Sequence, residues 1–93
     1  PMSSLLSRAH EHAANHLAAC ATRPVGVTAT HGELLTALRV PLADRGDDPA
    51  RVIDALAAAA TRGAVASGGP RFFGFVIGGS HPVALAADWL TST

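Results

Sequence analysis

The sequence predicts a mainly α-helical chain of three to four helices with one short, extended, phenylalanine-rich stretch. Apolar and small residues recur at helical spacing in several segments, which is the main sequence signal for amphipathic helices. Two of these segments open with helix start signals, at Thr30 and at Asp48. The three phenylalanines and the single tryptophan all lie between Phe72 and Trp89, so the end of the chain differs in character from the rest.

The composition predicts a single domain with a small core. Of the 93 residues 20 are alanine, and Leu, Ile, Val and Phe together number only 22. Alanine removes little apolar area from water, and each Å² contributes roughly 25 cal/mol. We therefore expect a larger partner surface to supply part of the stabilisation.

Charge and cysteine content exclude several function classes. The formal net charge is zero, and the seven basic residues are all arginines scattered along the chain. Nucleic acids and anionic membranes are bound by clustered excess charge, so we expect neither as a partner. The longest uncharged run is too short and too rich in glycine to span a membrane. A single cysteine, Cys20, and no secretory signal pattern predict a reducing, cytoplasmic location.

The first half of the chain predicts two helices joined by an arm. The first covers Ser3 to Ala21, with one face made of Leu6, Ala13, Leu17 and Cys20. Residues 22–29 contain a proline and a glycine and predict an extended connecting arm. Thr30 and Glu33 have capping-box spacing, which predicts a short helix through about Arg39.

A third helix is predicted between Pro49 and Arg62. Asp48 provides an N-cap acceptor, Pro49 fits the first helical position, and Gly63 stands where a glycine ends a helix. Its apolar residues form one stripe, the pattern of a helix packed on one neighbour, made of Val52, Ile53, Leu56, Ala59 and Ala60.

The remaining segment predicts a turn, an extended stretch and a last helix. Gly68-Gly69-Pro70 predicts a turn, residues 71–77 a short strand or extended segment, and Gly78-Gly79-Ser80 a second turn. The last helix begins near Pro82, and one face of it holds Val83, Ala86, Ala87 and Leu90 with Trp89 alongside. No helix stop signal follows Leu90.

Two histidines in the first predicted helix have metal-ligand spacing. His12 and His16 are four residues apart, so both imidazoles can reach one ion, with His10 and Glu11 nearby. A zinc site needs three or four ligands, and Ala14 breaks the H-E-x-x-H pattern. The sequence therefore favours a solvated polar face over a metal site.

The Gly78-Gly79-Ser80 turn has an anion-binding interpretation as well as a structural one. Bare backbone N–H groups before a helix can receive a phosphate or carboxylate. The nucleotide-binding motifs G-x-x-x-x-G-K-[ST] and G-x-G-x-x-G are both absent, which favours a structural turn. Ser80 is an N-cap or a nucleophile, and no His-acid pair supports the second role. His81 is an acid-base candidate without an identified partner, so packing or hydrogen bonding is favoured.

The aromatic run also has two interpretations. Phe72, Phe73 and Phe75 are typical core residues when taken singly. Together, beside glycines that let a ligand approach the backbone, they also fit the wall of an apolar substrate pocket.

This run closely resembles the N-terminal signature of the group II pyridoxal-phosphate-dependent amino-acid decarboxylases, a family that includes the aromatic-amino-acid, glutamate and diaminobutyrate decarboxylases. The shared pattern has a proline, a Phe-Phe pair, a small and an aromatic residue, glycine, and a proline-led helix, and here it extends from Gly69 to Leu90. Leu35 to Leu42 and the predicted Asp48-led helix match the family's helical extension more loosely.

The resemblance implies that the chain is the N-terminal segment of a fold-type I α/β lyase. Residues 1–66 are then a helical dimerisation arm, and residues 67–93 a substrate-side segment leading into the pyridoxal-phosphate domain. Phe75, Val76, Ile77 and Gly78 are the implied substrate-binding residues, with Phe72 and Phe73 anchoring them in the core.

The resemblance also implies the cofactor and the partners. Pyridoxal phosphate forms a Schiff base with a lysine. Because this chain has no lysine, the cofactor must be held by the remainder of the polypeptide, and no catalytic residue is assigned here. The implied partners are that remainder, a second subunit of a homodimer, and a small amino-acid substrate.

A second hypothesis needs no catalysis. The chain is then a helical interaction or self-associating module, and its aromatic residues form an exposed binding patch made of Phe72, Phe73, Phe75 and Trp89. The two hypotheses differ in whether a lysine-containing domain accompanies the chain.

Overall fold

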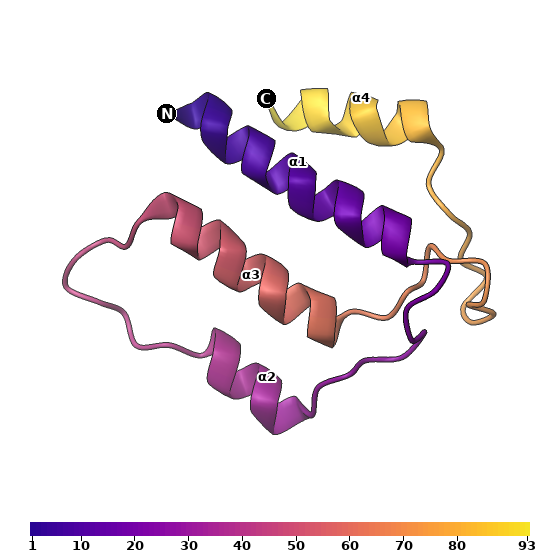
Figure 1. Ribbon diagram of the computed structural model, residues 1–93, viewed down its shortest axis with the longest axis horizontal. Helices are drawn as coiled ribbons and strands as arrows, with labels where there is room; N and C mark the ends of the chain where they lie inside the picture. The colour runs from indigo at the N-terminus through magenta and orange to yellow at the C-terminus, as the bar shows by residue number, and fades with distance from the viewer.

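The structure is a computed structural model that describes residues 1–93, and it contains four α-helices and no strand. The helices are α1 (Met2–Ala19), α2 (His31–Leu38), α3 (Pro49–Gly63) and α4 (Pro82–Ser92), as Figure 1 shows. The predicted helical class, the number of helices and their approximate bounds are confirmed. The molecule measures 44 × 34 × 20 Å, so it is thin in one direction. No helix has the length and apolar character needed to cross a membrane.

Local sequence signals start two of the helices as predicted. At α2 the backbone N–H of Glu33 donates to the Thr30 hydroxyl, and the Thr30 N–H donates to the Glu33 carboxylate, both at 3.1 Å. At α3 the Asp48 carboxylate accepts from the Ala50 N–H at 3.2 Å. Each side chain satisfies backbone donors that the first helical turn leaves without partners.

Helix α3 lies between α1 and α2 in a single layer (Figure 1). It therefore buries two flanks rather than the one stripe predicted from its sequence. Val52 and Leu56, both in the predicted stripe, are 52% and 58% exposed. Gly63 is the last residue of α3, and its missing side chain leaves room for Leu34 of α2, whose Cδ2 would lie 2.9 Å from an added Cβ.

The packed face of α1 agrees with the predicted one at Ala13 and Cys20 but not at its two leucines. Leu6 and Leu17 remain 52% exposed, whereas the half-buried residues of α1 are Leu5, Ala9, His12, Ala13, His16 and Ala19. The predicted stripe counted only apolar residues. The packed face includes two histidines because Asp54 and Arg23 provide partners for their rings.

The core is very small, as the alanine-rich composition predicts. Only four residues are buried: Cys20, Ala29, Ala59 and Ala66. Three of them, Cys20, Ala29 and Ala66, lie where the end of α1 and the arm after it meet the chain leaving α3. There the Thr28 N–H donates to the Arg62 carbonyl at 2.9 Å, and the Ala66 N–H donates to the Val25 carbonyl at 2.8 Å. Backbone hydrogen bonds thus join two segments that side-chain burial alone would hold weakly.

The phenylalanine-rich stretch is not a strand, because no other extended segment pairs with it. The first predicted turn is present around Gly69, whose N–H donates to the Ala66 carbonyl at 3.0 Å. The second turn lies at residues 74–76, not at Gly78-Gly79-Ser80 as predicted. Phe75 and Val76 form it with left-handed φ angles of 59° and 53°.

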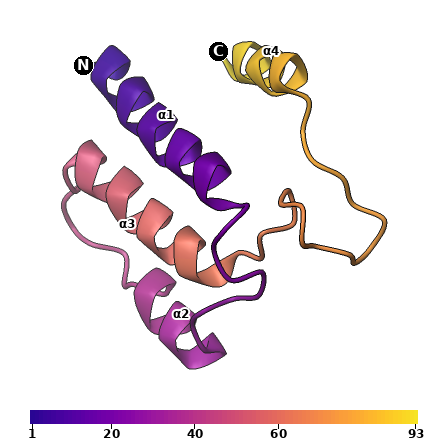
Figure 2. The same cartoon turned by 45° about the vertical axis from the view of Figure 1, so that its right-hand side comes forward.

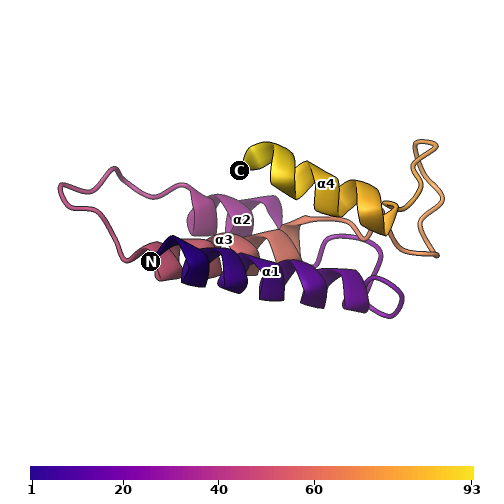
Figure 3. The same cartoon turned by 90° about the horizontal axis from the view of Figure 1, so that it is seen from above.

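Helix α4 lies apart from the three-helix layer (Figures 2 and 3). Its predicted apolar face is open, with Val83 68% and Leu90 77% exposed. Its Trp89 ring meets the His10 ring of α1 edge to face, with 6.1 Å between ring centroids. A glycine-rich linker and few contacts therefore leave the apolar face of α4 available to another surface.

Candidate functional site

The four residues implied to bind substrate lie together on the exposed loop between α3 and α4. Phe75 is 89% exposed and Val76 105%, whereas Ile77 is 48% exposed. Gly78 follows them, and no atom lies within 4 Å of the place where its Cβ would be. None of the four lines the groove between α1, α3 and α4 or the shallow pocket at the start of α2, so their role in a substrate pocket remains a prediction.

Inside this loop, Phe72 and Phe75 pack against each other, whereas Phe73 does not pack within this chain. The rings of Phe72 and Phe75 stack with centroids 6.5 Å apart and planes at 24°. Gly74 makes room for this, because an added Cβ would lie 3.1 Å from Cζ of Phe72. Phe73 is 93% exposed and so lies outside the core of this chain. The resemblance implied that Phe73 anchors the segment in the core, and within these residues it does not.

The base of the loop is fixed to the C-terminal end of α1. An added Cβ on Gly69 would lie 2.5 Å from the Cys20 carbonyl oxygen, so only glycine lets the two backbones approach this closely. Two residues later, the Arg71 guanidinium donates to the Arg23 carbonyl oxygen. The aromatic tip is therefore exposed on a loop whose base is held.

Arg23 connects the ends of α1 and α3. Its guanidinium donates to the carbonyl oxygens of Thr61 and, at 3.4 Å, Ala64. A further N–H lies 3.1 Å from Nδ1 of His16. Because arginine has only donors, Nδ1 must accept, which places a proton on Nε2 of His16, 3.6 Å from the Cys20 sulfur.

His12 and Arg8 of α1 share one carboxylate on α3. Nε2 of His12 lies 2.8 Å from Oδ1 of Asp54, and Arg8 donates to both carboxylate oxygens at 3.1 and 2.9 Å. The hydrogen bond from His12, and after it the one from Arg8, hold the pKa of Asp54 below its ordinary value. The predicted solvated histidine face is only partly correct, because the His12 side chain is 39% exposed while both His12 and His16 also have hydrogen-bond partners. No three metal-ligating side chains come together.

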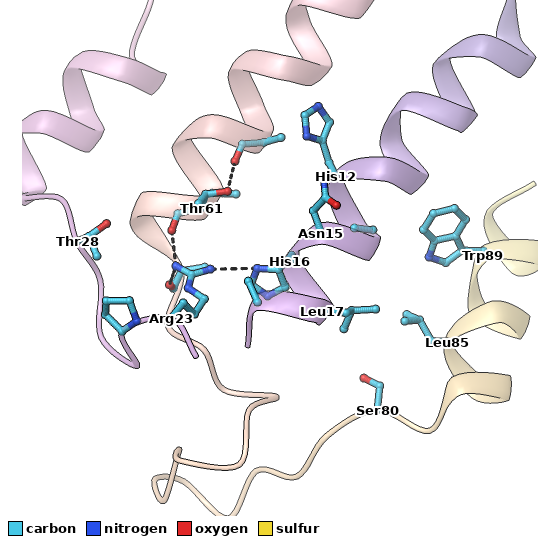
Figure 4. Close-up of a pocket in the computed structure, with 16 residues that line it drawn as sticks. His12, Asn15, His16, Leu17, Arg23, Thr28, Thr61, Ser80, Leu85 and Trp89 are labelled. Atoms are coloured by element: carbon cyan, nitrogen blue, oxygen red, sulfur yellow. Dashed lines mark hydrogen bonds between the residues drawn. The ribbon is translucent and has the colours of Figure 1, made fainter. Parts of the chain in front are cut away.

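A half-open groove of about 820 Å³ lies between the α1–α3 pair and α4 (Figure 4). Small side chains of α1 and α3 form much of its surface, including Ala13, Ala57 and Ala60, while α4 contributes Leu85 and Trp89. In Figure 4 Arg23 lies between Thr28 and His16, on the side of the groove away from Trp89. This volume is in the range of about 300–1,000 Å³ that is typical of small-molecule sites.

The remaining sequence candidates lie around the start of α4. Ser80 lines the groove, but its side chain makes no hydrogen bond and does not cap the helix. His81 occupies the N-cap position of α4, also without a side-chain capping bond. Neither side chain contacts an acid or a base, so the arrangement provides no activated nucleophile.

The residues present do not fit pyridoxal phosphate. The chain has no lysine for the Schiff base, and no acidic side chain lines the groove to pair with a pyridinium nitrogen. No step of cofactor chemistry can therefore be assigned to this chain. Compared with models of known protein families and with curated proteins, the sequence has no match in either.

Sequence reasoning missed the residues that organise the interior. Arg23 and Asp54 lie in different elements from their histidine partners, so their pairing has no local spacing. One signal was available: Arg8, His12 and His16 recur every four residues, which places three polar side chains along one side of α1. Such a row inside an otherwise alanine-rich helix indicates polar partners on the neighbouring helix.

Proposed function

We propose that this chain is the N-terminal segment of a pyridoxal-phosphate-dependent amino-acid decarboxylase, a carbon–carbon lyase. In this proposal it contributes contacts between subunits and an apolar wall of the substrate pocket, while the cofactor-binding lysine belongs to the remainder of the polypeptide. The cofactor supplies the electron sink for loss of carbon dioxide. The role of the present chain is to position the substrate and exclude water.

One observation carries the proposal: the loop with the decarboxylase-like signature is exposed at its tip and held at its base. Phe73, Phe75 and Val76 are at least 89% exposed, whereas Gly69 and Arg71 contact the end of α1. Such exposure of neighbouring large apolar residues marks a surface that meets another molecule. A fixed base is what a segment needs to present an apolar wall at a defined place.

The thin core supports the same proposal. A single layer of three helices with four buried residues removes little apolar area from water. Obligate interfaces resemble a domain core divided between two chains, and they supply the burial that each part lacks. A segment that packs against a large domain and a second subunit would gain stability in this way.

The decisive experiment uses the longest natural polypeptide that contains these 93 residues. It is purified with pyridoxal phosphate, reduced with borohydride and examined by intact-mass spectrometry, and carbon dioxide release is measured with aromatic amino acids, glutamate and diaminobutyrate. We expect a lysine carrying the reduced cofactor and release of carbon dioxide from one substrate class. A protein with neither property would overturn the proposal.

A pair of substitutions tests the role of the loop. In the whole enzyme Phe75→Ala should lower kcat/KM by about tenfold or more, the effect of losing an apolar contact in a substrate site, with cofactor absorbance unchanged. Leu42→Ala is the matched control, because Leu42 is 101% exposed but lies outside the signature. Loss of cofactor absorbance in Phe75→Ala would contradict the assignment.

The second candidate is a self-associating helical module, favoured by the open face of α4 with Val83 and Leu90 exposed. It predicts that the 93-residue chain forms a defined oligomer without any larger polypeptide. Light scattering after size exclusion distinguishes the two, since a segment of a larger enzyme has no reason to form one discrete species alone.

A further inference from the structure

Arg23 is a cation without a carboxylate partner at the edge of an apolar groove. Its three acceptors are two backbone carbonyls and a histidine ring. The carboxylates that form ion pairs do so with other residues. Asp54 pairs with Arg8 and His12, Glu33 pairs with Arg62, and Asp47 pairs with Arg51. No acidic residue lines the groove.

We propose that this groove binds an apolar monocarboxylate, with its carboxylate at Arg23 and its hydrocarbon part along the alanine surface toward Trp89. This inference does not depend on the proposed decarboxylase role. It assigns the ligand class from charge complementarity, since a half-buried cation beside apolar side chains is best satisfied by an anion.

The donors of Arg23 leave capacity for such a ligand. A guanidinium has five N–H groups, and only three hydrogen bonds to neighbouring acceptors use them here. These bonds also hold the guanidinium in place between the ends of α1 and α3. A positioned guanidinium loses less freedom when it binds a carboxylate than a flexible one does.

The surface of the groove matches the apolar part of the ligand. The side chains of Ala13, Ala57 and Ala60 are short and leave an open channel between α1, α3 and α4. Leu17 and Leu85 point toward it, and Trp89 forms the far wall (Figure 4). About 820 Å³ is enough for a medium-length chain or one aromatic ring.

The test is titration of the 93-residue chain with sodium octanoate, followed by the fluorescence of Trp89 and by calorimetry. Trp89 is the only tryptophan, and it lines the groove, so its emission reports directly on occupancy. We expect a saturable change with octanoate and binding at least about tenfold weaker with octan-1-ol, which lacks the charge. Equal binding of the two, or no saturable signal in either measurement, overturns the proposal.

Two kinds of variant test the position of the ligand. Arg23→Gln should weaken octanoate binding by about tenfold or more while octan-1-ol binding stays the same. Because Arg23 also joins two helix ends, a second variant leaves it intact: Ala60→Leu fills the channel and should abolish binding. Ala55→Leu is its matched control, since Ala55 lies on the same helix but does not line the groove. Circular dichroism verifies the helix content of each, and unchanged binding in folded Ala60→Leu overturns the proposal.

Discussion

Gly69→Ala tests whether the contact between the loop base and α1 stabilises the fold. The substitution places a Cβ 2.5 Å from the Cys20 carbonyl oxygen, whereas ordinary contacts begin near 3.4 Å. The two backbones must therefore separate by roughly 0.9 Å, the difference between those distances. Both atoms belong to or adjoin main chain, so no flexible side chain can absorb the shift.

The size of the effect follows from overpacking. Forcing an extra carbon into a tight contact costs about 1–3 kcal/mol. For a chain of this length each kcal/mol lowers Tm by about 4–8 °C, so a cost near the middle of the range lowers Tm by about 10 °C. Backbone strain does not contribute, because none of the glycines has a positive φ.

The assay is thermal unfolding followed by circular dichroism, with Gly68→Ala as the matched control. No atom lies within 4 Å of the Cβ position at Gly68. Alanine there should be neutral or should raise stability by about 0.4–1 kcal/mol, through reduced freedom of the unfolded chain. Equal Tm values for the two variants would refute the assigned contact.

Three further substitutions have distinct expected outcomes. Asp54→Asn should reduce the loss of stability in acid. The pKa of Asp54 in the folded protein lies below its unfolded value near 4. The contribution of Asp54 to the free energy of unfolding is therefore complete above about pH 4 and disappears as the pH falls through the folded pKa. Thr30→Ala removes the hydroxyl that caps α2 by accepting from the Glu33 N–H, and it should lower the free energy of unfolding in urea by about 1 kcal/mol. Val76→Gly should leave stability unchanged or raise it by up to about 1 kcal/mol, because Val76 is exposed and has φ 53°.

Each of these has a control and a contrary outcome. Asp44→Asn, at a carboxylate without an ion pair, should leave the acid dependence unchanged, and the same profile in both variants would argue against the His12–Asp54 contact. Thr30→Ser should retain the cap, so an equal loss in Thr30→Ser and Thr30→Ala would contradict the capping role. Val52→Gly, inside α3, should cost about 1 kcal/mol, and an equal cost in Val76→Gly would refute strain at the loop tip.

Local signals predicted the helices because each depends on residues adjacent in sequence. Thr30 with Glu33 and Asp48 with Pro49 start α2 and α3 wherever those helices lie in the molecule. For residues 71–77 the same reasoning left a strand and an extended segment open, and the structure has no strand there. A strand needs a partner strand, and the aromatic and β-branched composition of this segment says nothing about whether one exists.

The candidate site divides in the same way. The aromatic run at residues 72–75 could be seen in the sequence, whereas its exposure on a loop could not. The groove could not be predicted, because its walls come from three helices and its cation from the arm after α1. No spacing in the chain relates Arg23 to Trp89.

The sequence by itself determined the helical class, the helix starts and the small size of the core, since these follow from short-range capping geometry and from the scarcity of large apolar residues. The tertiary structure decided which faces those helices bury. Placing α3 between two neighbours exposed Val52 and Leu56, and bringing Asp54 and Arg23 against α1 turned two histidines inward. The physical reason is that a side chain's environment depends on its partners, and those partners are distant in sequence.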